Sequence, residues 1–323
     1  MDKNNIVNDE AELLTEIAIS YYQQGVTQEE ISKKFGLSRV KIGRLLKKAR
    51  ELGIVEITVK YHPVFSSQLE DKLKERFNIK RALLALDQPD EESQRALVAN
   101  LVSSYLSQRL QNGMVVSVGQ GRNVAAVANH LGVPPKKDCT FVCGIGGIHP
   151  KGDLQNADHI CRKFAKKYGG HSESLYAPAY VPNKALRQEL LNVSTIKDTF
   201  KRAQRADIAL MGVGDMNEKS FMVDLGWFTQ QEIVEARVNQ GVIGDIAGYD
   251  FYDIKGKVTK TAMSERVIGL SIDDFRNIEE VIAIASESSK PLALLGALRT
   301  GSIDVLATSV SNALTILNLD QQV

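Results

Sequence analysis

Beyond residue 80, short apolar runs typical of strands alternate with longer segments that have the spacing of amphipathic helices. The expected strands are Ala82–Leu86, Met114–Val118, Thr140–Cys143, Ile208–Met211, Val267–Leu270, Val281–Ala285 and Val305–Ala307. The expected helices include Glu91–Gln111, Asn123–Leu131, Ala157–Tyr168, Lys184–Leu191, Lys197–Arg205 and Lys290–Arg299. Because parallel strands need a crossover connection, usually a helix, this alternation predicts an α/β domain with a doubly wound, mostly parallel sheet.

Glycines gather after three of these strands, where sheets of this kind bind their ligands. The clusters are residues 119–123, which read Gly-Gln-Gly-Arg-Asn and lead into a helix, and residues 144–147 and 212–215. Backbone amides at a helix N-terminus favour an anion, and glycine lets a phosphate approach the backbone closely. The three clusters together favour a phosphate or sugar-phosphate site, although each alone is more typical of a tight turn. The chain lacks the glycine motifs of nucleoside triphosphate and dinucleotide sites.

The first 60 residues predict a helix, a short helix, a glycine turn and a third helix. Apolar residues spaced by three and four indicate a helix over Asp9–Gln24. Thr27 opens the short helix with a capping-box pattern, and Ser38 is a favourable N-cap for the third. With the tight turn at Gly36, this spacing is typical of a helix-turn-helix. The alternating stretch 54–59 predicts a strand that could form a wing.

The third helix lies in a basic block, although the net charge of the whole chain is only +1. Residues 33–50 contain eight Lys or Arg and no Asp or Glu, which is the footprint of a phosphate-backbone contact. The alternatives are a solvated helix face and a helical subdomain that binds protein. The residues expected to contact DNA are Thr27, Ser38, Arg39, Lys41, Arg44, Lys47 and Lys48. Arg39 could pair with guanine, whereas the lysines would neutralise phosphates.

Length and composition suit a two-domain protein without a membrane segment. The chain has 323 residues, 43% of them hydrophobic, and the pattern breaks around His62 and Pro63. We therefore expect a DNA-binding domain over 1–60 and an effector-binding and oligomerisation domain over 61–323, beginning with a linker helix at Gln68–Phe77. No apolar run reaches transmembrane length, no signal peptide is evident and cysteines number only three. These features predict a cytoplasmic protein with reduced thiols.

Nearly the whole chain resembles the SorC family of bacterial sugar-responsive transcription regulators. The resemblance is carried by residues 21–57 (YYQQGVTQEEISKKFGLSRVKIGRLLKKARELGIVEI), LYAPAYV (175–181), ADIALMGVG (206–214), GDIAGYDFYDIKGKV (244–258) and ALRTGSIDVLATS (297–309). Members pair a helix-turn-helix with an effector domain similar to sugar-phosphate isomerases and deaminases, and they are typically tetramers. The resemblance implies a regulator of a carbohydrate-utilisation operon. Its affinity for operator DNA would change when it binds a sugar or sugar phosphate.

The resemblance also implies an effector site, carried over by position. Its residues are Gly119, Gln120, Gly121, Arg122, Asn123, Gly146, Gly147, Asn156, Asp245 and Lys290. Amides, Arg122 and Lys290 would hold a phosphate, while Asp245 and Asn156 would hold sugar hydroxyls. Asp245 is alternatively a turn residue and Lys290 a solvent-facing residue at a helix start. Many relatives read G-Y-F-F-D where this chain reads residues 248–253, one residue longer, so the loop shape there should differ.

A sugar-phosphate isomerase or deaminase is the alternative to a regulator. Such an enzyme needs a positioned acid and base, but no spacing singles out Asp215, Asp245 or His149, and no nucleophile motif is present. A zinc site is also weighed, from Cys139, Cys143, His149, His159 and Cys161, whose spacing does not match a compact structural site. We therefore expect no cofactor, no metal and no enzymatic activity.

Overall fold

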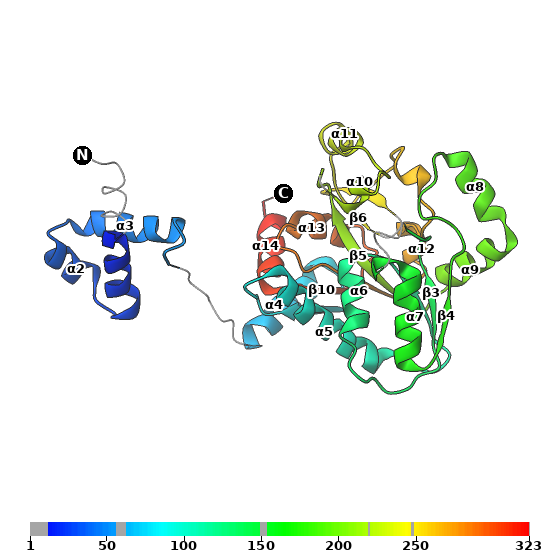
Figure 1. The fold of residues 1–323 in the computed structure, drawn as a ribbon, viewed down its shortest axis with the longest axis horizontal. Coiled ribbons are helices and arrows are strands. Elements are labelled where there is room, and N and C mark those ends of the chain that lie inside the picture. Colours follow the sequence, from blue (N-terminus) through cyan, green and yellow to red (C-terminus); the bar gives the residue numbers. More distant parts are fainter. Residues whose placement is uncertain (1–11, 56–62, 149–153, 219, 247–248, 323) are drawn as a thin grey trace. The chain divides into compact units, whose positions relative to one another are not determined.

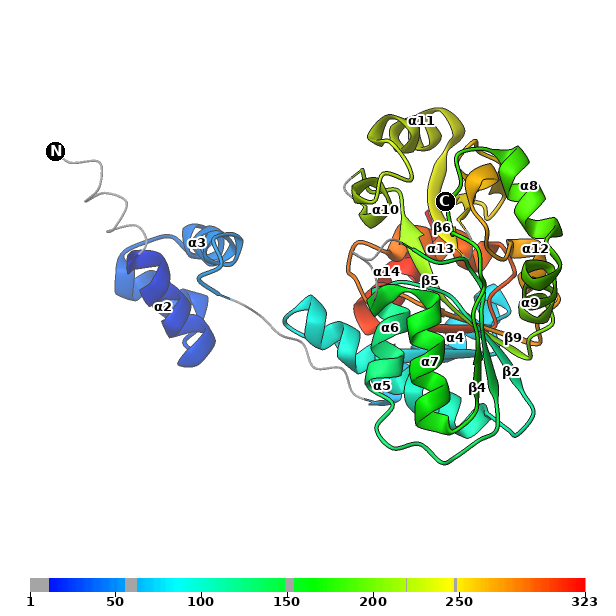
Figure 2. The same cartoon turned by 45° about the vertical axis from the view of Figure 1, so that its right-hand side comes forward.

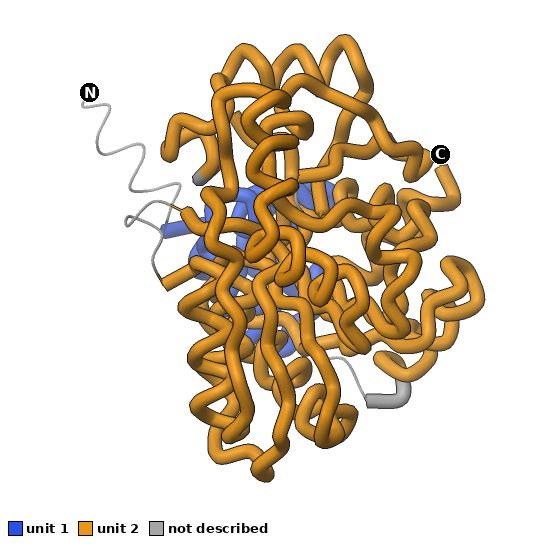
Figure 3. The backbone as a smooth tube through the Cα atoms, turned by 90° about the vertical axis from the view of Figure 1, so that its right-hand side faces the viewer, with its two compact units in different colours: residues 1–60 blue, residues 61–323 orange. Residues whose placement is uncertain are grey.

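The computed structural model describes residues 12–55, 63–148, 154–218, 220–246 and 249–322. The chain divides into two compact units, residues 1–60 and residues 61–323, which Figure 3 distinguishes by colour. We refer to them as unit 1 and unit 2. Within the described ranges, no helix combines the length and the apolar character needed to cross a membrane.

Unit 1 is helical over most of its described residues. Residues 12–18 form a helix that continues as η1 (Ile19–Gln23), and α2 (Gln28–Phe35) and α3 (Arg39–Glu51) follow. One aliphatic face of each helix enters a common core, in which Ile17, Ile31, Ile42 and Leu46 are at most 2% exposed. The expected order of helix, short helix, turn and helix is confirmed from residue 12 onward. Residues 56–59 of the expected wing lie outside the described residues.

Unit 2 is built on a ten-stranded sheet, in which seven parallel strands run in the order β1-β10-β9-β5-β2-β3-β4. Figures 1 and 2 show this sheet within unit 2 from two directions. These strands are β1 (Arg81–Ala85), β2 (Val115–Val118), β3 (Thr140–Cys143), β4 (His171–Glu173), β5 (Ile208–Asp215), β9 (Glu280–Ile284) and β10 (Val305–Ser309). An antiparallel extension leaves the carboxyl end of β5, through β6 (Val242–Ile246), β7 (Asp250–Asp253) and β8 (Val258–Thr259). The expected mostly parallel α/β sheet is confirmed.

Helices cover both faces of this sheet. One face carries α5 (Glu91–Arg109), α6 (Arg122–Asn129) and α7 (Ala157–Tyr168). The other carries α4 (Pro63–Phe77), α9 (Ser194–Gln204), α13 (Pro291–Arg299) and α14 (Val310–Asp320). The remaining helical segments are α8 (Lys184–Asn192), α10 (Phe221–Asp224), α11 (Gln230–Gln240), η3 (Ser264–Arg266) and α12 (Ile272–Phe275).

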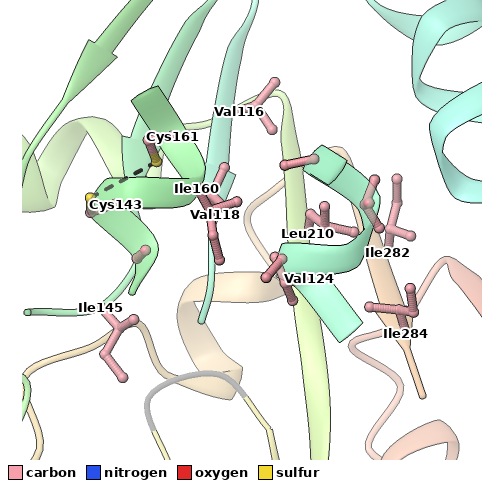
Figure 4. Close-up of a cluster of buried hydrophobic side chains, with 14 of the residues drawn as sticks. Val116, Val118, Val124, Cys143, Ile145, Ile160, Cys161, Leu210, Ile282 and Ile284 are labelled. Carbon is pink, nitrogen blue, oxygen red and sulfur yellow. Dashed lines mark hydrogen bonds between the residues drawn. The ribbon is translucent and has the colours of Figure 1, made fainter. Parts of the chain in front are cut away.

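Successive residues of a strand pack into two different hydrophobic cores, one on each face of the sheet. On β9, Ile282 and Ile284 belong to the core under α5, α6 and α7, whereas Val281 and Ala283 belong to the other. This alternation follows from the two-residue period of a strand. Figure 4 shows the first core, with Val116, Val118, Leu210, Ile282 and Ile284 from the strands beside Val124 of α6 and Ile160 of α7. The doubly wound arrangement therefore buries both faces.

Two predictions about strands are wrong, and four strands are missed. Val267–Leu270 is buried but makes only isolated bridges, such as Tyr180 with Val267. The strand prediction failed here because a run of apolar residues indicates burial and does not by itself indicate pairing with another strand. The glycine cluster at 212–215 lies within the end of β5, where it pairs with β6, and not in a loop after a shorter strand. The strands β4, β6, β7 and β8 were not anticipated, since β4 is short and polar and β6 contains Gly244 and Asp245.

Candidate functional site

Local hydrogen bonds fix the connection between α2 and α3. The Thr27 hydroxyl accepts from the Glu30 amide at 3.3 Å, and the Thr27 amide donates to the Glu30 carboxylate at 3.0 Å, which completes a capping box. The Thr27 hydroxyl also donates to this carboxylate, at 2.8 Å. Gly36 ends α2 in the left-handed region, with φ 65° and ψ 27°. Ser38 caps α3 by accepting from the Lys41 amide at 3.2 Å. The Thr27 hydroxyl thus uses its single O–H donor in positioning α2, whereas the Ser38 hydroxyl can still donate to a phosphate.

Cations occupy the outward face of α3. The buried face consists of Ile42, Leu46 and Ala49. The exposed residues Arg39, Lys41 and Arg44 form no ion pair with any acidic side chain in the described part of the chain. Lys47 lies 3.7 Å from Glu51 in an exposed pair, and Lys48 is half-buried. An exposed i,i+4 pair is worth little, so Lys47 can exchange its partner for a phosphate.

In unit 2, a cavity of about 340 Å³ opens at the carboxyl ends of three adjacent parallel strands, β2, β5 and β9. Because these ends meet at one edge of the sheet, residues far apart in the sequence converge there. The polar and charged lining includes Gln120, Arg122, Asn123, Asp215, Asp245, Tyr249, Glu287, Ser289 and Lys290. The antiparallel β6–β7 hairpin supplies Asp245 and also Phe251.

The loop after β2 brings backbone to the cavity wall. A Cβ on Gly119 would lie 2.7 Å from the Met211 Sδ, and Gly121 has φ 108°, which side-chain-bearing residues rarely adopt. Their amides already donate to the carbonyls of Leu210 and Gln155, at 2.9 Å and 3.0 Å. Gly121 is the N-cap of α6 and offers no side-chain cap. The first amides of α6 therefore lack both helical acceptors and a cap, which suits an anion.

Glu287 organises the side of the cavity next to α6. Its Oε2 accepts from Asn123 Nδ2 at 2.9 Å, and the Arg95 and Arg122 guanidiniums lie 3.6 Å and 3.7 Å from its Oε1. Burial opposes ionisation of Glu287, but the Asn123 hydrogen bond and nearby cations outweigh it and lower its pKa. Asn123 is 8% exposed and acts as a buried positioning residue, whereas the Arg122 side chain is 58% exposed and can turn toward a ligand.

Three charged side chains meet on the opposite side. Lys290 Nζ lies 3.3 Å from Asp215 Oδ2, which also accepts from Ser289 Oγ at 3.0 Å. The Asp245 carboxylate packs so closely on Gly214 that a Cβ there would lie 2.0 Å from Oδ2. Burial raises the pKa of Asp245 to about 7, with Lys290 opposing the rise and Asp215 adding to it. Asp245 can therefore exchange a proton near neutral pH.

An aromatic wall completes the cavity. It is formed by Phe228, Tyr249 and Phe251, whose rings pack edge to face. Tyr249 has φ 63°, and its hydroxyl accepts from Gln120 Nε2 at 3.0 Å. The centroid of the Trp227 ring lies 5.8 Å from that of the Tyr249 ring, so the indole packs against this wall but does not line the cavity. Aromatic faces of this kind suit the apolar face of a sugar ring.

Seven of the ten predicted effector residues line this cavity, and Gly146, Gly147 and Asn156 do not. A Cβ on Gly146 would lie 2.6 Å from the Ala177 carbonyl oxygen and the Ala179 nitrogen, so glycine permits close backbone packing there. The Gly147 amide donates to the Ala177 carbonyl at 2.8 Å. Asn156 is the N-cap of α7. These three residues support the loops beside the cavity.

Sequence reasoning missed Glu287, Ser289 and the aromatic wall. The signal for the first two was the polar run Ser-Glu-Ser-Ser at 286–289, which follows the apolar strand β9. Among the described residues, no group of three or more His, Cys, Asp or Glu could hold a metal ion. Cys143 and Cys161, from the zinc set, are buried thiols whose Sγ atoms lie 3.9 Å apart (Figure 4). His149 lies outside the described residues.

Comparisons with known proteins connect both units to one family. Residues 61–318 match the family model described as "Putative sugar-binding domain". The sorbitol operon regulator of Klebsiella pneumoniae is 29% identical over 317 residues, which cover 96% of this chain and 99% of that protein. The deoxyribonucleoside regulator of Bacillus subtilis is 26% identical over 312 residues, covering 96% of this chain and 98% of that protein.

Solved structures agree with these relatives. The full-length sorbitol operon regulator SorC from Klebsiella pneumoniae has a TM-score of 0.72 at 28% identity, and the match covers 95% of this chain and 98% of that chain. A "Putative Sugar-Binding Domain of Transcriptional Repressor" from Vibrio fischeri has a TM-score of 0.75 at 56% identity, covering 79% of this chain and 99% of that chain. The relatives are transcriptional regulators and not enzymes. The chain belongs to the SorC family of sugar-binding transcriptional regulators.

Proposed function

We propose that this regulator binds operator DNA through unit 1 and a phosphorylated sugar in the cavity of unit 2. The observation that carries the proposal is the chemistry of the cavity. It joins the uncapped N-terminus of α6 and Arg122, which suit a phosphate, to Asp215, Asp245 and Lys290, which suit hydroxyls. Its volume of about 340 Å³ lies in the range of small-molecule sites.

The proposed ligand lies with its phosphate toward α6 and its hydroxyls toward β6. Arg122 turns from Glu287 to the phosphate, because its contact with Glu287 is long, at 3.7 Å, and its side chain is exposed. Asp245, when ionised, accepts from hydroxyl groups, and Lys290 donates to a hydroxyl oxygen. Asp245 is half-buried, so a hydroxyl can reach it from the cavity.

In unit 1, the proposed roles divide along α3. Arg39 and Arg44 contact base edges and adjoining phosphates, while Lys41, Lys47 and Lys48 neutralise phosphates and Ser38 donates to one. A dimeric arrangement places two such helices about one DNA turn apart, and we propose that four copies assemble as a tetramer. The target is a carbohydrate-utilisation operon, and the proposed location is the cytoplasm.

The proposed link between the units is α4. Its Leu69 and Leu73 are at most 2% exposed and pack in unit 2, and Arg76 contacts Asp320 of α14. A ligand changes operator affinity only if it binds two arrangements of the protein unequally. A shift of unit 2 that moves α4 would change the spacing of the reading helices.

Intrinsic fluorescence tests the ligand directly, because Trp227 is the single tryptophan and packs behind the aromatic wall. The full-length protein is titrated with glucose, ribose, sorbitol and their monophosphates. The proposal expects at least one phosphate to change the emission at micromolar concentration, with its unphosphorylated parent much weaker. Lys290→Met should weaken this response, whereas Lys197→Met, an exposed lysine on α9, should not. Equal responses to a sugar and its phosphate would contradict the phosphate assignment.

A further inference from the structure

One exposed apolar side chain lies in the middle of the cationic face of α3. Val40 is the second residue of this helix and is 67% exposed. At 100° per residue, it lies on the opposite side of the helix from the buried residues Ile42 and Ala49. It belongs to neither hydrophobic cluster of unit 1. Folding of the described part of unit 1 therefore does not explain a valine here.

The charge around Val40 indicates what covers it. Arg44 and Lys47 follow at four and seven residues, on the same face, and Arg39 and Lys41 are its exposed neighbours in the chain. A surface that binds there must be anionic around its edge and apolar at its centre. Local propensity does not favour valine either, because a β-branched residue lowers helix propensity.

Double-stranded DNA offers that combination. Phosphates line the major groove, and the C5-methyl group of thymine is the apolar feature among the base edges within it. The first turn of the reading helix is the part that reaches base edges in a helix-turn-helix, and Val40 lies in that turn. An aliphatic side chain against a thymine methyl excludes water from both.

We propose that Val40 contacts the C5-methyl group of a thymine in each operator half-site and so determines specificity at that base pair. The proposal rests on the DNA-binding function proposed for unit 1. The neighbouring cations supply affinity that is independent of sequence, whereas Val40 distinguishes thymine from the other bases. Arg39 and Arg44, on either side, restrict how the helix can rotate in the groove and hold Val40 toward one base step.

The test removes the methyl group from the DNA and the side chain from the protein. The full-length protein first selects duplexes from a random DNA library, which defines a consensus site. Each thymine of that site is then replaced singly by deoxyuridine, which keeps base pairing and lacks only the methyl. Dissociation constants are measured by fluorescence anisotropy for the wild type, Val40→Ala and Leu52→Ala. Leu52 is a matched control, because it is 60% exposed at the far end of the same helix, about 18 Å away.

One thymine in each half-site should be sensitive to this replacement. For wild type and Leu52→Ala, its conversion to deoxyuridine should raise the dissociation constant about fourfold, the factor that burial of one methyl group gives. For Val40→Ala the same conversion should have less than a twofold effect, with the thymine duplex bound about as weakly as the deoxyuridine duplex. Because Val40 is exposed, Val40→Ala should keep the wild-type circular dichroism spectrum.

The outcomes separate this proposal from the function on which it rests. If the selection yields no consensus, sequence-specific DNA binding fails, and the role of Val40 fails with it. If a consensus is bound tightly but no single replacement of thymine by deoxyuridine weakens binding, the role of Val40 is overturned. This result is expected if the partner of the Val40 face is an acidic protein. A thymine that is equally sensitive in Val40→Ala also overturns it and leaves the DNA-binding function standing.

Discussion

Asp245→Asn should change how the stability of unit 2 depends on pH. Burial raises the pKa of this carboxyl from 3.8 to about 7, and Lys290 opposes the rise while Asp215 adds to it. Folding raises the pKa of this carboxyl, so its contribution to stability is fully present when the pH is below the pKa of the unfolded state. That contribution is lost as the pH rises toward the pKa of the folded state. The loss is about 1.4 kcal/mol for each pH unit well below the folded pKa. Because half of the folded molecules are already ionised at pH 7, it amounts to about 2.3 kcal/mol between pH 5 and pH 7. Asparagine does not titrate and avoids this loss.

The single tryptophan makes the measurement specific for unit 2. Trp227 is 7% exposed and stacks on Tyr180, with 5.8 Å between ring centroids, so its emission in urea follows unfolding of its own unit. The free energy of unfolding is measured from pH 5 to pH 8 at one protein concentration. The difference between Asp245→Asn and wild type should shift in favour of the variant by about 2.3 kcal/mol from pH 5 to pH 7. It should shift by only about 0.4 kcal/mol more between pH 7 and pH 8, where the curve levels off.

Neighbouring residues supply controls and tests of sign. Asp198→Asn, on the exposed face of α9, should keep the wild-type pH dependence. Asp215→Asn removes an anion and should lower the pKa of Asp245, whereas Lys290→Met removes a cation and should raise it. If the difference between Asp245→Asn and wild type stayed constant from pH 5 to pH 8, Asp245 would titrate alike in the folded and unfolded chains. Burial would then not raise its pKa.

Three further predictions concern the two sites and their scaffold. Where the arginine pairs with guanine, Arg39→Ala and Arg44→Ala should each weaken operator binding by about 1–3 kcal/mol in anisotropy titrations. Sugar-phosphate binding should stay intact, and loss of both activities would indicate damage to the fold or assembly. Gly146→Ala should destabilise unit 2 by about 1–3 kcal/mol in urea, because its Cβ would lie 2.6 Å from backbone. Gly147→Ala, whose Cβ would meet nothing closer than 3.9 Å, should change stability by less than about 0.5 kcal/mol, and equal effects would contradict the packing argument. Glu287→Gln should cost about 3 kcal/mol because Arg95 loses its buried counter-ion, and an unchanged urea midpoint would exclude that role.

Much of the fold follows from local sequence signals. Thr27 with Glu30, the left-handed Gly36 and the Ser38 cap each act within a few residues, so the helix-turn-helix could be predicted from residue types at fixed spacing. The parallel strands could be predicted because strands buried on both faces read as continuous apolar runs. The loop at 119–123 could be placed at the carboxyl edge of the sheet, where it lines the cavity, because it joins a buried strand to a helix.

The rest depends on contacts between residues that are distant in the sequence. Lys290 pairs with Asp215, 75 positions earlier, and Asn123 donates to Glu287 only because β2, β5 and β9 are neighbours in the sheet. Strand order is not encoded in any local pattern. The same limit applies to Gly146, because its close packing against residues 177–179 could not be predicted from local sequence.

We expect a phosphorylated sugar bound in unit 2 to change the affinity of unit 1 for operator DNA. The most direct measurement is fluorescence anisotropy of the full-length protein on its selected operator duplex, with and without each sugar and sugar monophosphate. We expect one sugar phosphate to change the dissociation constant at least fivefold, the lower end of typical coupling between two sites, and Lys290→Ala to abolish that change while leaving DNA affinity intact. If no sugar or sugar phosphate altered the affinity for the operator, the proposed control of DNA binding by a sugar phosphate would be wrong.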